Sequence, residues 1–317
     1  MRLAGSEGLV SPVDFLSLAV RMAWGTITYL LAYRAVPIAA VASSIALILL
    51  VRPERWLSWA RGQSRIRQLA GATILGFTRP TTRGEVEKYL RLVASRPLAA
   101  VVYLAVSHNL TIYYLLLLGP LLGKDVLLSH VIGGVAFMLV AVPLVGRVVI
   151  EPGDAGREPP PRSDSCSTET CGELVRFTGL LLYGSLLGGT IAAWGLSPWA
   201  FAPAKIARSS PISQLLNAVL GGIVSVALWM WPVANLFVGT YLWKTGLAHA
   251  GLVAFFYAST VSPQRLRLYA KVMARPSAAR FAAALATASV VAGFVTAIVY
   301  RVFGLTIHYK LIPKQLL

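Results

Sequence analysis

Residues 126–150 read VLLSHVIGGVAFMLVAVPLVGRVVI, a continuous apolar run in which Arg147 is the only charged residue. About 20 apolar residues in a helix cover the roughly 30 Å of hydrocarbon in a bilayer. This stretch therefore predicts a membrane-spanning helix. Other apolar runs of this kind are Phe15–Tyr33, Val36–Val51, Leu98–Leu118, Phe177–Leu196, Ile212–Trp231, Val233–Thr260 and Ala282–Phe303.

The composition of the whole chain agrees with these runs. Hydrophobic residues make up 56% of the 317 residues and charged residues only 13%, whereas about a quarter of the residues in a soluble domain are charged. We therefore predict an all-α, polytopic integral membrane protein. Its expected location is the cell membrane, which it crosses several times, with the lipid bilayer as its main partner.

The net charge of +17 could suggest a nucleic-acid partner, but the distribution of charge favours the positive-inside bias of short membrane loops. Basic residues concentrate in Arg52–Arg67, Arg79–Arg96, Arg147–Arg176 and Arg265–Arg280, and are few in Ser197–Ser210. Placing the basic segments in the cytoplasm predicts an internal N-terminus and an external C-terminus. We expect no nucleic-acid partner. The first apolar run has no signal-peptide cleavage site and is expected to be retained, across the membrane or along its surface.

The segment Glu151–Glu173, EPGDAGREPPPRSDSCSTETCGE, has four prolines, six acidic residues and no apolar periodicity. Such a composition predicts a mobile linker. It divides the chain into a first transmembrane portion (1–150), a cytoplasmic linker (151–175) and a second transmembrane portion (176–317). Cys166 and Cys171, the only cysteines, lie in this linker. Two thiols do not complete a zinc site, so we expect solvated thiols, no metal site and no cofactor.

The two portions show a similar order of segments, which predicts an inverted repeat of the kind found in transporters; ordinary alternation of spans and loops is the alternative. In the first portion Leu69–Thr78 is too short to cross a bilayer as a helix. In the second, Pro232 and the Lys244–Gly246 tripeptide interrupt the apolar runs. We therefore expect eight to ten helices, of which about seven cross fully and two are broken or re-entrant.

The best candidate site interrupts the run Leu98–Leu118 with four polar residues, Ser107, His108, Asn109 and Thr111. Polar groups in a hydrocarbon layer are costly unless they face protein or water. They are predicted to bind substrate, or else to form hydrogen bonds between helices.

The second portion carries a counterpart, Asn235 with Ser259 and Thr260. Arg83, near the first predicted break, suits an anionic substrate; alternatively it lies on the cytoplasmic surface and pairs with Glu87.

Short motifs in both portions carry a resemblance to a known family: Arg55–Trp59, Thr81–Gly84, Ser107–Thr111, Trp231–Ala234 and Ala258–Ser262. In order and spacing, over roughly residues 36–304, the chain resembles a family of predicted permeases that includes the organoarsenical efflux permeases. The resemblance implies a broken segment in each half and a transport function. That family carries a Cys-Ser-Cys-Gly element where Thr81 and Arg83 stand here. Neither residue is a soft ligand, so arsenical transport is not carried over.

From the sequence we expect a permease that moves a small solute or ion, in efflux or uptake, by alternating access. No nucleotide-binding motif is present, so an ion gradient or a separate ATPase would supply the energy. A non-transporting membrane subunit or scaffold is the alternative. We do not expect an enzyme, because no nucleophile–base pair stands out. The pair Gly184 and Gly188 permits close helix packing within the monomer or in a homodimer.

Overall fold

The computed structural model describes the following parts of the chain: residues 16–17, 20–21, 24–25, 28, 58–59, 64–78, 96–148, 183–184, 186–187, 190, 210–228, 232–245 and 247–305. Every element within these residues is a helix, which confirms the all-α prediction for this part of the molecule. The linker with its two cysteines, the Thr81–Gly84 motif and most of the first apolar runs lie outside the described residues.

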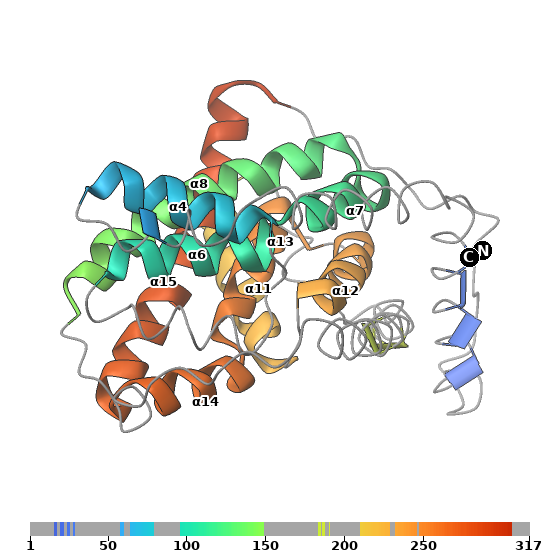
Figure 1. Ribbon diagram of the computed structural model, residues 1–317. Helices are drawn as coiled ribbons and strands as arrows, with labels where there is room; N and C mark the ends of the chain where they lie inside the picture. Colours follow the sequence, from blue (N-terminus) through green and yellow to red (C-terminus); the bar gives the residue numbers. More distant parts are fainter. Residues whose placement is uncertain are drawn as a thin grey trace.

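Along the sequence the helices form two groups, one before and one after residues 151–175, and helices of both groups pack together (Figure 1). The first group comprises α4 (Arg65–Thr78), α6 (Pro97–Asn109), α7 (Ile112–Leu122) and α8 (Lys124–Gly146). The second comprises α11 (Pro211–Ala227), α12 (Pro232–Thr245), α13 (His249–Ala258), the 3₁₀ turn η2 (Ser259–Val261), α14 (Pro263–Val272) and α15 (Arg275–Val302).

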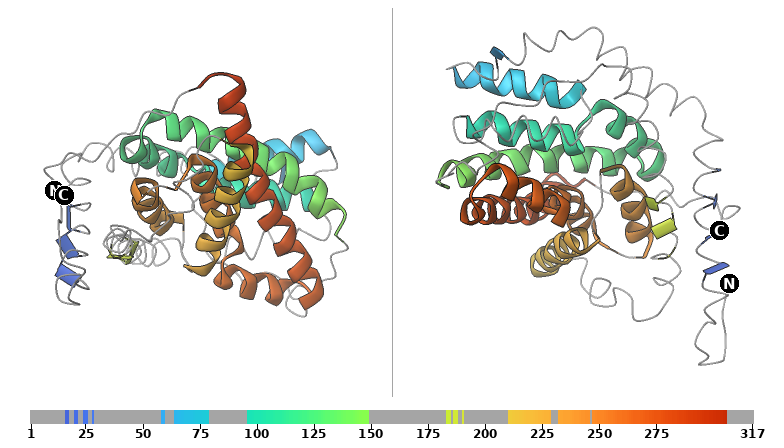
Figure 2. Two further views of the ribbon diagram at one scale, coloured as in Figure 1. Left: turned by 180° about the vertical axis from the view of Figure 1, so that it is seen from behind. Right: turned by 60° about the horizontal axis from the view of Figure 1, so that its bottom comes forward.

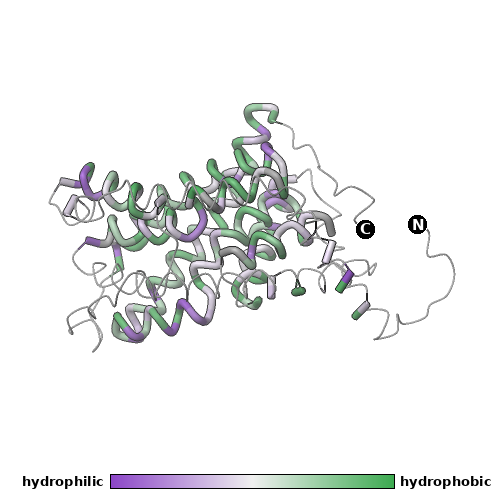
Figure 3. The backbone as a smooth tube through the Cα atoms, turned by 45° about the vertical axis from the view of Figure 1, so that its right-hand side comes forward, coloured by the Kyte–Doolittle hydropathy of each residue, from purple (hydrophilic) through white to green (hydrophobic). Residues whose placement is uncertain are grey.

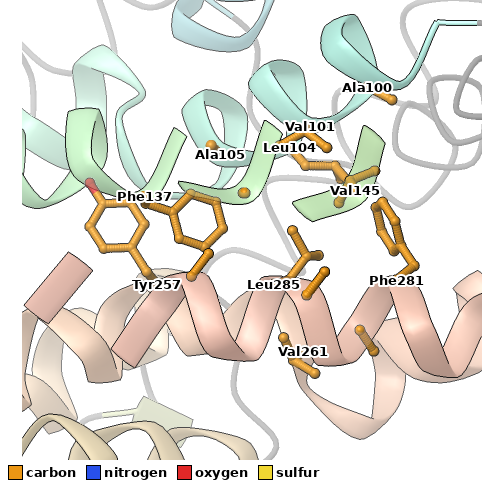
Figure 4. Packing of buried hydrophobic residues seen from close by; sticks show 14 of the residues in the cluster. Ala100, Val101, Leu104, Ala105, Phe137, Val145, Tyr257, Val261, Phe281 and Leu285 are labelled. Carbon is orange, nitrogen blue, oxygen red and sulfur yellow. The ribbon is translucent and has the colours of Figure 1, made fainter. Parts of the chain in front are cut away.

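Two of the described helices, α8 and α15, are long and apolar enough to cross a membrane. They pack against each other in opposite directions. The hydroxyl of Tyr300, near the end of α15, donates to the carbonyl of Asp125 at the start of α8 (2.6 Å). At the other end, Phe281 of α15 lies in the same core cluster as Val145 of α8 (Figure 4). The C-terminal end of α8 and the N-terminal end of α15 therefore lie together.

Around this pair the helices are stacked in a continuous series. Figure 2 shows α4 packed on α6, α6 on α8, α8 on α15, and α15 on α11. The core between them is aromatic and aliphatic, with Phe137 of α8 stacked on Tyr257 of α13 at a ring separation of 5.2 Å (Figure 4).

Glycines allow close packing within each group. In α4, a Cβ on Gly76 would lie 2.9 Å from the backbone nitrogen of Ser107 in α6. In α11, a Cβ on Gly221 would collide with the carbonyl of Gly251 in α13. Each group thus contains a pair of helices that approach to backbone contact, α4 with α6 and α11 with α13.

The spacing of the later elements also repeats. Helix α14 begins 151 positions after α7 (Pro263 and Ile112), and α15 begins 151 positions after α8 (Arg275 and Lys124). Residues in this part of one group therefore have counterparts 151 positions away in the other.

One prediction about the spans was wrong. The run Leu98–Leu118 is not a single helix, because α6 ends at Asn109 and α7 begins at Ile112. Thr111 adopts an extended backbone conformation (φ −64°, ψ 148°), which stops the helix. The run contains no proline or glycine from which this break could be predicted. In the second group α12 ends at Thr245, within the predicted Lys244–Gly246 interruption.

The outer helices expose apolar side chains along one face. On α11, Ile212, Leu216 and Ile223 are 73%, 63% and 61% exposed. On α8, Leu128, Val135 and Leu139 form a similar stripe at helical spacing. Hydrophobic positions also prevail along the tube of the helical bundle in Figure 3.

Candidate functional site

Two helix breaks meet inside the molecule. The first lies between α6 and α7, and the second is formed by η2 between α13 and α14. They are joined by a buried hydrogen bond of 2.7 Å between His108 Nε2 and Ser259 Oγ. These two residues are 151 positions apart, so the bond connects counterpart positions of the two groups.

A buried arginine completes this contact and fixes the state of the histidine. Arg265, in the first turn of α14, is only 4% exposed, and its Nη2 lies 3.2 Å from His108 Nδ1. Since a guanidinium group only donates, Nδ1 must accept and carries no proton. In the neutral ring the hydrogen is then on Nε2, which donates to the Ser259 hydroxyl. That hydroxyl in turn donates to the carbonyl of Phe256.

Two further hydroxyl groups at the second break donate to backbone carbonyls within it. The hydroxyl of Thr260 donates to the carbonyl of Tyr257 (2.7 Å). The hydroxyl of Tyr269, on α14, donates to the carbonyl of Thr260 (2.6 Å). These bonds satisfy backbone carbonyls that the ends of α13 and η2 leave free.

At the first break a histidine of α8 holds the backbone at the end of α6. His130 Nε2, on α8, donates to the carbonyl of Asn109 (2.7 Å). The His130 ring is stacked on that of Tyr257 at 5.0 Å, and the Tyr257 hydroxyl donates to the His130 carbonyl. An aromatic cluster of α8 and α13 thus fixes the end of α6.

The side chains of Asn109 and Thr111 are both completely buried. Among the residues that the structure describes, neither the amide oxygen and nitrogen of Asn109 nor the hydroxyl of Thr111 has a hydrogen-bond partner. Leaving a buried polar group unsatisfied costs about 1–3 kcal/mol. Ordered water, a ligand or another conformation can supply the partners that such groups lack.

The other predicted site residues are distributed as follows. Ser107 is buried in α6, beside Gly76. Asn235 is buried in the first turn of α12, and within the described residues its side chain has no partner and no hydrogen bond to the His108 group. Arg83 lies outside the described residues. The structure thus brings Ser259 to His108, while substrate binding by these residues remains a prediction.

Sequence reasoning missed Arg265 as a site residue. It was counted among the basic residues of the segment Arg265–Arg280, which is predicted to be cytoplasmic, and the structure shows that its side chain is buried. A signal was present, because Leu268, Tyr269 and Val272 follow at helical spacing and place Arg265 on the apolar face of α14. Arg267 is exposed.

The chemistry that this cluster offers is hydrogen bonding. Within the described part of the chain no group of histidine, cysteine and acidic side chains could hold a metal ion. The cluster offers one guanidinium group, one neutral imidazole, an amide and hydroxyl groups.

No protein-family model matches the sequence, and neither the curated proteins nor the solved structures include a match to it.

Proposed function

We propose that this chain is a multi-pass membrane permease whose solute passes between the two helix breaks. Two features of the helices support a location in a bilayer. Helices α8 and α15 have the length and composition of membrane spans, and the exposed stripes of α8 and α11 are apolar. Lipid chains would cover these stripes, whereas in water large exposed apolar faces favour association.

We also infer that the two groups form an inverted repeat. It is supported by the common offset of 151 positions and by the opposite directions of α8 and α15. Inverted repeats with interrupted helices are an arrangement of secondary transporters, in which substrate binds where the breaks meet. The resemblance to the predicted permease family agrees with this assignment.

The observation that carries the proposal is the bond between His108 and Ser259. It links the two breaks at equivalent positions, so that a relative movement of the two groups would open or close the space beside it. Non-helical backbone deep in a membrane protein is tolerated where it is buried in protein or lines an aqueous cavity.

Cysteine accessibility tests the proposal. Cys166 and Cys171 are replaced by serine, and a single cysteine is introduced by Thr111→Cys. A membrane-impermeant thiol reagent is then applied to vesicles of each orientation. Ser289→Cys serves as the control, since Ser289 is also fully buried and its hydroxyl bonds only to the carbonyl of Leu285 in its own helix.

We expect Thr111→Cys to react from both sides and Ser289→Cys from neither, with both variants melting near the parent temperature. A second candidate function is a non-transporting membrane subunit, which the hydrogen bonds of Ser259, Thr260 and Tyr269 to backbone carbonyls at the second break favour. Absence of reaction at Thr111→Cys from either side, in a folded protein, would reject the permease in favour of that subunit.

A further inference from the structure

The two breaks place the ends of four helices close to one another. A helix carries a partial negative charge at its C-terminal end and a partial positive charge at its N-terminal end, each about half an elementary charge. The negative ends here are those of α6 and of α13 with η2, and the positive ends are those of α7 and α14.

The negative ends have a compensating charge within the chain. Arg265 is buried and hydrogen-bonded to His108, one residue before the last residue of α6. A guanidinium group in this position interacts favourably with the carbonyl end of that helix.

The positive ends lack the equivalent acidic group among the described residues. Neither α7 nor α14 has an acidic residue in its first turn. Their N-cap residues, Thr111 and Ser262, form no side-chain capping bond. Asp125, at the start of α8, is the only acidic residue in the described part of the chain, and residues 174–317 contain no acidic residue at all.

A second and independent observation points to a ligand at the start of α7. Thr111 and Asn109 are completely buried, and in the part of the chain that the structure describes their side-chain polar atoms have no partner. The Thr111 hydroxyl and the Asn109 amide both have hydrogens to donate. Donors at a helix N-terminus form a ready-made binding site for an anion.

We propose that the first break binds a small anion, held by Thr111 and Asn109 at the N-terminus of α7, with Arg265 contributing positive potential through its place beside His108. We infer a small anion, a halide or a small oxyanion or carboxylate, because both side chains are completely buried in this structure. This proposal rests on the proposed permease function, for which it names the substrate class.

The test uses the purified full-length chain in detergent, with its melting temperature followed by tryptophan fluorescence. Sodium chloride, nitrate and formate are titrated against sodium gluconate at constant ionic strength. We expect at least one of the small anions to raise the melting temperature saturably, whereas gluconate does not.

Three variants test the site itself. Thr111→Val, which preserves shape, and Arg265→Gln are each expected to weaken the apparent anion affinity about tenfold. Asn109→Asp places a fixed carboxylate at the site; it is expected to abolish the response to anions and to raise the melting temperature in gluconate. Thr240→Val is the matched control, because the hydroxyl of this buried threonine bonds to the carbonyl of Leu236 in its own helix.

Each result has a defined meaning. If no small anion stabilises the parent, or if Thr240→Val weakens the response as much as Thr111→Val does, the anion site is rejected. It is also rejected if Glu85→Gln with Glu87→Gln creates an anion response that the parent lacks, since a carboxylate of the chain would then fill the site.

The cysteine test separates this inference from the proposed function. Reaction of Thr111→Cys from both sides, without any stabilisation by anions, overturns the anion and leaves the permease. Saturable stabilisation that Thr111→Val weakens, without reaction from either side, supports the anion site and overturns transport.

Discussion

The two helix breaks occupy equivalent places in the chain but differ in how their polar groups are satisfied. At the second break, hydroxyl groups of Ser259, Thr260 and Tyr269 each donate to a backbone carbonyl. At the first, Asn109 and Thr111 are just as deeply buried, yet within the described residues their side chains have no partners.

This difference indicates a division of roles. The second break is held in place by these three bonds to backbone carbonyls and serves as a support. Enclosed donors without partners, as at the first break, lower stability unless a ligand or a change of conformation supplies partners. We therefore expect mutations at the second break to reduce stability, and mutations at the first to change binding.

The largest effect on stability is expected from Arg265→Leu. This change leaves Nδ1 of His108 without its donor in a buried place, and hydrogen bonds to charged groups contribute about 1.5–3 kcal/mol. Melting of the purified protein should show a clear decrease. Arg267→Leu is the control, because Arg267 is exposed on the same helix and surface changes fall within about 0.5 kcal/mol. Equal melting of both variants would contradict the supporting role of Arg265.

The next effect is expected from Ser259→Ala, which removes the acceptor for His108 Nε2. The donor that remains is buried, so the loss should be about 1–2 kcal/mol. Chemical unfolding in mixed detergent measures it, with Ser289→Ala as the comparison, since its hydroxyl bonds only within its own helix. A Ser259→Ala protein as stable as Ser289→Ala would mean that the two breaks do not support each other.

A smaller effect is expected from Tyr269→Phe, which removes one neutral hydrogen bond to the carbonyl of Thr260. Bonds of this kind in membrane proteins average about 0.6 kcal/mol. The change should therefore lower the free energy of unfolding slightly, and Tyr183→Phe, at an exposed tyrosine, should not. If both variants unfold alike, the second break is less constrained than its hydrogen bonds indicate.

The smallest effect on stability is expected from Thr111→Val in buffer without small anions. The hydroxyl that it removes has no partner among the described residues, so stability should be unchanged or slightly higher. Thr260→Val, at the second break, should instead lose about 0.6 kcal/mol with the bond to the carbonyl of Tyr257. A loss at Thr111→Val equal to that at Thr260→Val would remove the difference between the breaks.

The all-α class and two of the long helices could be predicted, because long apolar runs favour helices. The runs containing α8 and α15 are of this kind, and both helices are found. The break in Leu98–Leu118 was not predicted, since the sequence there lacks proline or glycine. It is fixed instead by tertiary contacts, such as the bond from His130 to the Asn109 carbonyl, which no local pattern contains.

The candidate site was predicted in part for the same reason. Four polar residues within an apolar run single out Ser107–Thr111 without any knowledge of the fold. The pairing of His108 with Ser259 depends on how two distant segments pack. Arg265 was not predicted as a site residue, because the basic residues that follow it indicated a surface segment.

The shortness of the broken helices has an electrical consequence. Helix α6, with 13 residues, extends about 20 Å, which is less than the roughly 30 Å of a hydrocarbon layer. In the bilayer that we propose, water or lipid headgroups would have to reach toward the break to cover the difference. The membrane voltage would then fall over a shorter distance, so that the field is strongest where the two breaks meet. An anion moving through that field would gain or lose up to about 2.3 kcal/mol for each 100 mV, and its flux would depend steeply on voltage.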